Sequence, residues 1–194
     1  MSESPESSAY TAQRYFALAE EGLLSPDERV ELLEGLIVAM APQSPAHAAA
    51  VWRTTHALER CVSQGAIVRA QCSFIASEFS VPEPDVCIVE GSIEDYERVH
   101  PSRALLIVEI ASSSLAPDRL TKSRIYAAAA IPQYWIVNLR DGVVESYTDP
   151  DPPARVYKRT VVHRRDETIR VVALPECSVR VEDLFPRERP ASSD

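Results

Sequence analysis

Apolar positions along the first half of the chain change their period from segment to segment. Over residues 47–62 they recur every three to four positions, which predicts an amphipathic helix. Over residues 68–74 apolar and polar side chains alternate, which is the period-two pattern of a half-buried strand. A second strand is expected at 85–89. The continuous apolar run 104–108, which ends in Glu109, predicts a central strand covered on both faces.

The second half of the chain predicts one helix and then several strands. Pro117 opens a helix that runs to about Ala130. An Asp-Gly pair, a strong hairpin signal, lies between strands at 134–139 and 143–147. Two further runs, 155–162 and 168–172, have the pattern of another strand pair. The expected order is therefore helix, three strands, helix, strand, with additional β-hairpins. This order is typical of an α/β (α+β) sandwich rather than a regularly alternating doubly wound sheet.

A segment near the N-terminus carries conflicting local signals. Residues 25–28 have the form of a capping box with proline at the first helical position. Residues 30–40, however, are rich in apolar and β-branched side chains around Gly35. Two alternatives follow. Either a short helical turn leads into a strand near 36–40, or the segment is a β-hairpin that turns at Glu34-Gly35.

One domain is expected to account for most of the chain. A chain of 194 residues can bury roughly 70% of the surface that its unfolded form exposes, so its core needs no disulfide or metal. A first helix is expected over 11–21, near the start of a single domain that spans 9–185. The polar end 1–8 and the Pro-, Arg- and Ser-rich tail 186–194 are predicted to be flexible.

Composition restricts both the compartment and the kind of site. The apolar runs are far shorter than the ~20 residues that cross a bilayer, so no membrane passage is expected. The acidic N-terminal segment lacks the features of a signal peptide, which indicates a cytoplasmic, reducing location. The cysteines have no CxxC or zinc-site spacing and are expected to be buried thiols, and the histidines form no HExxH motif. These cysteines are Cys61, Cys72, Cys87 and Cys177.

Charge is distributed unevenly along the chain, whose net charge is −9. This overall acidity argues against a protein that coats nucleic acid through long-range attraction, because phosphate binding relies on Lys and Arg. Residues 155–170 nevertheless carry six Lys and Arg side chains against two acidic ones. The stretch could face phosphate, but the more frequent explanation for it alone is a β-hairpin whose arginines point to solvent.

Two carboxylates and a lysine occur in an order that suits metal chemistry. Asp85 opens one predicted strand and Glu109 ends the next, so both could reach one sheet edge and bind a hard cation such as Mg²⁺. Lys122 lies one turn into the following helix, in a chain that uses eighteen Arg and only two Lys. Each residue also has a structural alternative. Glu109 could mark the point where its strand reaches the surface, or pair with an arginine. Lys122 could pair with Asp118 on an exposed helix.

Six short segments carry a resemblance to a known family. They are RVELLEGLIVAM (29–40), SPAH (44–47), EPDV (83–86), LIVEIAS (106–112), DRLTK (118–122) and PQYWIV (132–137). Together, in this order and over most of residues 10–185, they resemble the Uma family of restriction-endonuclease-like proteins in the PD-(D/E)xK nuclease superfamily. The implied fold is a restriction-endonuclease-like core with a central sheet and flanking helices.

The resemblance implies roles for several charged residues. Asp85 and Glu109 would hold Mg²⁺ or Mn²⁺, and Lys122 would serve the attacking water. Glu31 matches a further acid of the family near the metal, with Glu34 as the second choice. The implied catalytic set therefore consists of three carboxylates and one lysine.

Other matching positions have less defined roles. His47, at the start of the long helix, matches a family histidine, although a lone histidine caps or packs as often as it acts. Tyr126 and Trp135 are assigned mainly to core packing, with Tyr126 as an accessory residue that lines the cleft. The usual acid-x-lysine triplet of the superfamily is absent, since Ala111 stands where its lysine would be. Lys122 must therefore act from the helix.

The resemblance thus implies a Mg²⁺- or Mn²⁺-dependent endonuclease that hydrolyses phosphodiester bonds of DNA. DNA is the expected partner, and a homodimer with paired sites would suit cleavage of both strands of a duplex. The overall acidity supports an alternative, a nuclease-like module that binds nucleic acid or a protein partner without cutting. A third alternative is a structural dimer module, which predicts a partner contact at the hairpin 134–147 and no ligand at the acid pair.

Overall fold

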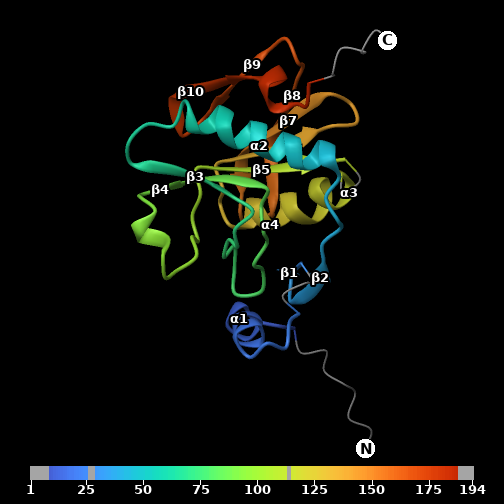
Figure 1. The fold of residues 1–194 in the computed structure, drawn as a ribbon, viewed down its shortest axis with the longest axis vertical. Coiled ribbons are helices and arrows are strands. Elements are labelled where there is room, and N and C mark those ends of the chain that lie inside the picture. Colours follow the sequence, from blue (N-terminus) through green and yellow to red (C-terminus); the bar gives the residue numbers. More distant parts are fainter. Residues whose placement is uncertain (1–8, 26–28, 113–114, 188–194) are drawn as a thin grey trace, which may run out of the picture.

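A six-stranded mixed sheet forms the centre of the structure (Figure 1). The structure, a computed structural model, describes residues 9–25, 29–112 and 115–187. In spatial order the strands are β3 (Ala66–Ala70), β4 (Val86–Glu90), β5 (Leu106–Ala111), β6 (Gln133–Asn138), β7 (Val143–Asp151) and β8 (Val156–His163). Within this sheet β5 and β6 run parallel, and the other neighbouring pairs are antiparallel.

A parallel strand pair requires a crossover, and a helical segment provides it. This segment consists of α3 (Leu115–Pro117), a π-helical turn η2 (Asp118–Lys122) and α4 (Ser123–Ala128). It covers one face of the sheet, where the Tyr126 ring lies 5.1 Å from the Tyr134 ring of β6. The helix predicted from Pro117 is confirmed, although part of it is a π-helical turn.

The opposite face is covered by the long helix α2 (Pro45–Glu59) and by a hairpin of β9 (Thr168–Val171) and β10 (Leu174–Arg180). Figure 1 shows α2 and this hairpin on the side of β5 away from α4. The 3-10 turn η3 (Val181–Leu184) follows β10. The Ser44 hydroxyl caps α2 by accepting a hydrogen bond from the His47 N–H. In the part of the chain that the structure describes, no helix is long and apolar enough to span a bilayer.

A small N-terminal unit packs beside the sheet. It contains α1 (Ala12–Glu20) and the hairpin of β1 (Val30–Leu33) and β2 (Leu36–Ala39), joined by a hydrogen bond from the Tyr15 hydroxyl to the Val30 carbonyl (2.8 Å). The hairpin alternative is therefore correct. Its turn needs glycine because Gly35 has φ +82° and a Cβ there would lie 2.5 Å from the Ala9 Cβ. The capping box at 25–28 falls almost entirely outside the described residues, as do the flexible ends predicted over 1–8 and 186–194.

The predicted fold class and core order are confirmed, but one strand pairing is wrong. The strands near 155–162 and 168–172 do not pair with each other. Instead β8 extends the central sheet beside the long strand β7, and β9 pairs with β10, a strand that the sequence pattern did not predict. The strand predicted at 68–74 is β3, which ends earlier because Gln71 adopts a left-handed backbone conformation (φ 52°).

The prediction of four buried thiols is confirmed only for Cys87, since Cys72 is half-buried and the other two cysteines form a disulfide. Cys61, just after α2, forms a disulfide with Cys177 of β10. The two residues are 116 positions apart, so no short spacing motif could indicate the bond. Cys72 and Cys87 are free thiols, and burial raises the pKa of Cys87 to about 12.

An ion pair fastens the π-helical turn to the sheet. Arg119 donates from Nε and Nη2 to the Glu145 carboxylate on β7, at 2.9 and 2.5 Å. Tyr147 and Asn138 also donate to this carboxylate. Burial acts to raise the pKa of Glu145, but these hydrogen bonds outweigh it and lower the pKa below its usual value of 4.5.

We expect Glu145→Gln to lower the free energy of unfolding by about 2 kcal/mol at neutral pH, because hydrogen bonds to a charged group are lost. A group with a lowered native pKa stabilises the fold above its unfolded pKa, and this contribution disappears as the pH falls through the native pKa. The difference between wild type and Glu145→Gln should therefore shrink below about pH 4.5. Urea unfolding of both proteins at a series of pH values measures this difference in the free energy of unfolding. A difference that stays constant through the acid range would contradict this explanation.

Candidate functional site

Four charged side chains from distant parts of the sequence meet at one cavity of about 350 Å³. Glu31 lies on β1, Asp85 directly precedes β4, Glu109 lies in β5, and Lys122 ends the π-helical turn. Each is more than nine-tenths buried. These four residues are called the acidic cluster below.

The strand register brings Asp85 beside Glu109. Val86 of β4 faces Val108 of β5 in an antiparallel pair, so continuing the register by one residue sets Asp85 against Glu109. The Asp85 Oδ2 accepts a hydrogen bond from the Ile110 N–H (2.8 Å). This contact holds the Asp85 carboxylate against β5.

Glu109 lies inside its strand, whereas the sequence pattern placed it at the strand end. The strand continues to Ala111, and Glu109 is 3% exposed. A buried carboxylate is tolerated when it has partners. The Glu109 Oε1 accepts from Lys122 Nζ (3.1 Å) and from the Tyr126 hydroxyl (2.7 Å), and these bonds explain how the carboxylate is accommodated inside β5. Neither structural alternative for Glu109, a surface position or an arginine partner, describes this arrangement.

Lys122 is buried between two carboxylates. Its Nζ lies 3.1 Å from the Glu109 Oε1 and 3.2 Å from the Glu31 Oε2. The alternative of an exposed helical pair with Asp118 therefore does not describe its position. Asp118 is itself buried and lines the same cavity. The sequence analysis did not include Asp118 among the site residues, although a spacing of four residues from Lys122 indicates a shared helix face.

The cavity contains more acidic than basic charge. Burial raises the pKa of Glu109 well above its usual range; the Lys122 ammonium opposes this shift, and the carboxylates of Asp85, Asp118 and Glu31 add to it. Burial acts to lower the pKa of Lys122, but the surrounding carboxylates outweigh it and raise that pKa. Four carboxylates line the cavity together with two cations, the Lys122 ammonium and the Arg29 guanidinium, and Arg29 is itself paired with Glu83. The cavity therefore has an excess of acidic groups, which an added cation would offset.

Two of the predicted accessory residues contact the acidic cluster. The His47 Nε2 lies 3.0 Å from the Asp85 Oδ2, and the first turn of α2 places it there. The Tyr126 hydroxyl donates to Glu109, as described above, so this tyrosine does more than pack in the core. The sequence analysis placed Tyr126 by the resemblance alone and did not use its spacing of four residues from Lys122, which also indicates a shared helix face. Trp135 is fully buried on the opposite side of the sheet, in the cluster of α2.

The two glutamates of the β1–β2 hairpin point to different partners. Glu31 contacts Lys122, whereas Glu34 lies in the turn with φ 49° and forms ion pairs with Arg124 and Arg155. Burial acts to raise the pKa of Glu34, and its hydrogen bonds to these arginines lower it. Glu34 thus lies outside the acidic cluster and fastens the hairpin to α4.

The chemistry of these side chains fits a hard divalent cation. Within the described residues, no three His, Cys, Asp or Glu side chains form a ready metal site. Magnesium, however, is usually bound by one or two carboxylates, with water and phosphate as its other ligands. The contacts described above involve the Asp85 Oδ2 and the Glu109 Oε1. They do not involve the second oxygen of either carboxylate, the Asp85 Oδ1 or the Glu109 Oε2. Asp85 and Glu109 are therefore the pair suited to a cation.

Comparison with known proteins identifies the family of the chain and a solved structure with the same fold. A crystal structure described as "a putative nuclease belonging to DUF820", from Anabaena variabilis ATCC 29413, has the same fold, with a TM-score of 0.69. It is 17% identical in sequence, and the match covers 90% of this chain and 97% of that one. No curated protein sequence matches the chain. The family model Uma2, described as "Putative restriction endonuclease", matches residues 12–182. The resemblance found in the sequence is thus confirmed, and the chain belongs to the Uma2 family.

Proposed function

We propose that this protein is a nuclease that hydrolyses phosphodiester bonds of DNA with the help of Mg²⁺ or Mn²⁺. The observation that carries the proposal is the buried acidic cluster, in which Asp85, Glu109 and Lys122 line one cavity. The description of the family as restriction endonucleases supports the reaction class.

Asp85 and Glu109 are the residues that would hold the cation. When bound there, the ion would supply Lewis-acid activation of a water molecule and offset the charge of the phosphate. The chain keeps both carboxylates in place before any ligand arrives. Asp85 is fixed by the Ile110 N–H and His47, and Glu109 is fixed by Lys122 and Tyr126.

Lys122 would act as a fixed positive charge. A lysine ammonium donates three hydrogen bonds, and two of the Lys122 contacts are to Glu31 and Glu109. The remaining donor is available for a phosphate oxygen or for the attacking water. Glu31 reaches Lys122 from the separate β1–β2 hairpin, so its role is to position the ammonium in the cavity.

An exposed tryptophan near the cavity supports a nucleic acid substrate. Trp52 of α2 is 60% exposed, and its ring stacks on the His56 ring at 4.0 Å. It lines a recess of about 240 Å³, and Gln43 borders both this recess and the cavity of the acidic cluster. Exposed aromatic rings bind unpaired bases by stacking, which works for every base. A strand whose phosphate lies at the acidic cluster could therefore place a base on Trp52.

We expect a single-stranded oligonucleotide to quench the tryptophan fluorescence of this protein in EDTA. Of the two tryptophans, Trp52 is exposed and Trp135 is fully buried, so the signal reports on Trp52. Trp52→Phe should remove the quenching and keep most of the binding, whereas Trp52→Ala should weaken binding about tenfold. An abasic oligonucleotide serves as the control and should not quench. Unchanged emission of the wild type at saturating oligonucleotide would contradict this role.

The proposed activity is tested by incubating the protein with supercoiled plasmid, single-stranded DNA and RNA, each with Mg²⁺, Mn²⁺ or EDTA. We expect cleavage of DNA that EDTA abolishes. Linear plasmid formed without a nicked intermediate would support a homodimer with paired sites. Binding of DNA with no cleavage under any metal condition would contradict the proposal and favour the nuclease-like binding module, the alternative that the net charge of −9 supports.

A further inference from the structure

A second cavity lies on the side of the sheet away from the acidic cluster. It has a volume of about 450 Å³ and lies between the β7–β8 strands of the sheet and the β9–β10 hairpin. Gln133 at the start of β6 forms its floor. Its neighbour Tyr134 packs with Tyr126 on the face of Glu109, and successive strand residues point to opposite faces, so Gln133 faces away from the acidic cluster.

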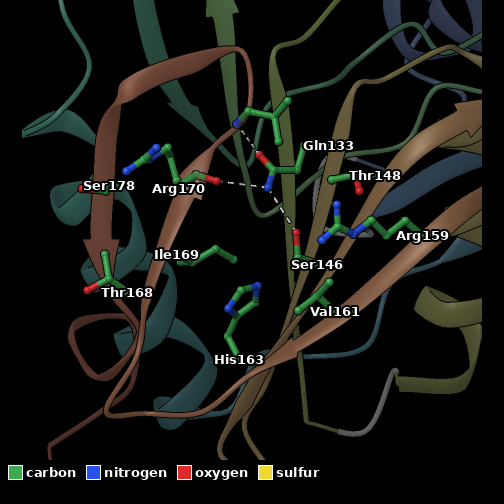
Figure 2. Close-up of a pocket in the computed structure, with 11 residues that line it drawn as sticks. Gln133, Ser146, Thr148, Arg159, Val161, His163, Thr168, Ile169, Arg170 and Ser178 are labelled. Carbon is green, nitrogen blue, oxygen red and sulfur yellow. Dashed lines mark hydrogen bonds between the residues drawn. The ribbon is translucent and has the colours of Figure 1, made fainter.

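The floor of this cavity is held rigidly by hydrogen bonds. Gln133 is 2% exposed, and its Nε2 donates to the Ser146 Oγ and to the Arg170 carbonyl, both at 3.1 Å. Its Oε1 accepts from the Val172 N–H at 2.8 Å. Figure 2 shows these three bonds, which link β6 and β7 to the hairpin. Because the Ser146 Oγ accepts from Gln133, its own hydroxyl proton remains to be donated.

The walls of the cavity carry hydrogen-bond donors and no carboxylate. Arg159 and His163 of β8 line one wall, and Arg170 borders the other with its backbone carbonyl, its side chain directed away from Gln133 (Figure 2). Figure 2 shows the Arg159 guanidinium and the His163 ring directed toward the space beside Ser146. The Nδ1 of His163 contacts Glu167 at 3.5 Å, which leaves Nε2 as the ring nitrogen for a ligand. No Asp or Glu is among the residues that line the cavity.

The side chains of Arg159 and Arg170 are not neutralised by a carboxylate of the described residues. Within the described part of the chain, no ion pair involves Arg159 or Arg170, although the protein has 29 acidic residues and a net charge of −9. Arg124, Arg155 and Arg119, by contrast, each pair with a carboxylate. A pocket that gathers cations and hydroxyls but excludes acids is complementary to an anion.

We propose that this cavity binds a small phosphate monoester, with the phosphate held by Arg159, His163 and the Ser146 hydroxyl. A planar guanidinium matches phosphate oxygens in a bidentate manner. A phosphate group alone would fill a minor part of the volume, which lies in the range of sites for whole small ligands. The remaining wall is apolar, with Val161 and Ile169, and suits an attached ring. This inference is independent of the proposed nuclease activity.

Calorimetry with adenosine 5′-monophosphate as the probe, in EDTA, tests the proposal. We expect one binding site per chain, and Arg159→Gln should weaken binding about tenfold or more because a charge-assisted contact is lost. Arg159 is exposed, so the variant should fold normally. Arg140→Gln is the matched control, since it removes the same charge from an exposed turn outside the cavity and should leave binding unchanged.

Two further probes separate the sources of affinity. Inorganic phosphate should bind more weakly than adenosine 5′-monophosphate but with the same dependence on Arg159. Adenosine, which lacks the phosphate, should bind much more weakly. The proposal is overturned if no nucleotide binds, if adenosine binds as tightly as its monophosphate, or if Arg159→Gln and Arg140→Gln behave alike. Binding of an oligonucleotide that Arg159→Gln weakens, without binding of the mononucleotide, would likewise overturn it, in favour of a surface for a nucleic acid backbone.

Discussion

Replacing Lys122 with methionine is expected to lower the free energy of unfolding by about 3 to 5 kcal/mol, the typical loss when one partner of a buried ion pair is removed. The Lys122 ammonium lies between Glu31 and Glu109, and all three residues are more than nine-tenths buried. Methionine fills a similar volume but leaves two buried carboxylates without their cation. The loss should therefore come from charge rather than from packing.

The chain provides a matched control for this substitution in its other lysine. Lys158 forms an ion pair with Asp151 at 3.1 Å, but its side chain is 55% exposed. Exposed pairs contribute little, so Lys158→Met should change the stability by less than about 1 kcal/mol. Urea unfolding at neutral pH measures both variants. Equal effects of the two substitutions would show that Lys122 is not held in a buried ion pair.

A double substitution tests the coupling directly. If Lys122 and Glu109 stabilise each other, Lys122→Met combined with Glu109→Gln should cost less than the sum of the two single changes. Additive effects would indicate that the two groups do not interact in the folded protein.

The second large effect is expected on catalysis. Glu109→Gln should reduce the rate of DNA cleavage about a thousandfold, because a metal ion contributes several kcal/mol to such a reaction and each 1.4 kcal/mol is a factor of ten. Glutamine has nearly the shape of glutamate and can still accept from the Tyr126 hydroxyl, so the fold should be retained. The neutral amide, however, binds a divalent cation much less strongly than a carboxylate.

Single-turnover nicking of supercoiled plasmid measures this effect, with circular dichroism to verify folding. Glu90→Gln is the matched control, because Glu90 ends the neighbouring strand β4 and is exposed. It should cleave at the wild-type rate. A folded Glu109→Gln protein with wild-type activity would exclude Glu109 from the reaction.

The sequence predicted the placement of the acid pair well because strand periodicity is a local property. Asp85 opens the strand predicted at 85–89, and Glu109 directly follows the apolar run 104–108. These two positions were enough to place both carboxylates on neighbouring strands. The position of Glu109 within β5 was not predictable in the same way. Its burial depends on Lys122 and Tyr126, which reach it from a helix after the strand.

The choice between Glu31 and Glu34 also depends on geometry that the sequence pattern does not contain. Both glutamates belong to one hairpin, and a shift of one residue in a strand reverses the face of every side chain. The turn at Glu34-Gly35 determines the register, and it directs Glu31 to Lys122 and Glu34 to the arginines. The sequence pattern allowed either a helical turn followed by a strand or a β-hairpin in this segment, so it did not determine the register.

Long-range pairing was the least predictable part of the fold. The β9–β10 hairpin and the Cys61–Cys177 disulfide connect segments whose partners are set by the shape of the core around α2. Propensity and periodicity describe each segment alone and do not choose among several strands as partners. The cavity above Gln133 exists only because the hairpin packs there, so no local motif indicated it.

The most direct test of the acidic cluster as a metal-dependent nuclease site is plasmid cleavage by wild type, Asp85→Asn and Glu109→Gln with Mn²⁺, with Mg²⁺ and with EDTA. We predict that the wild-type protein nicks plasmid with either metal but not in EDTA, and that both folded variants are inactive under all conditions. Wild-type cleavage that persists in EDTA, or that either folded variant retains, would contradict the assignment of Asp85 and Glu109 as the residues that hold the ion.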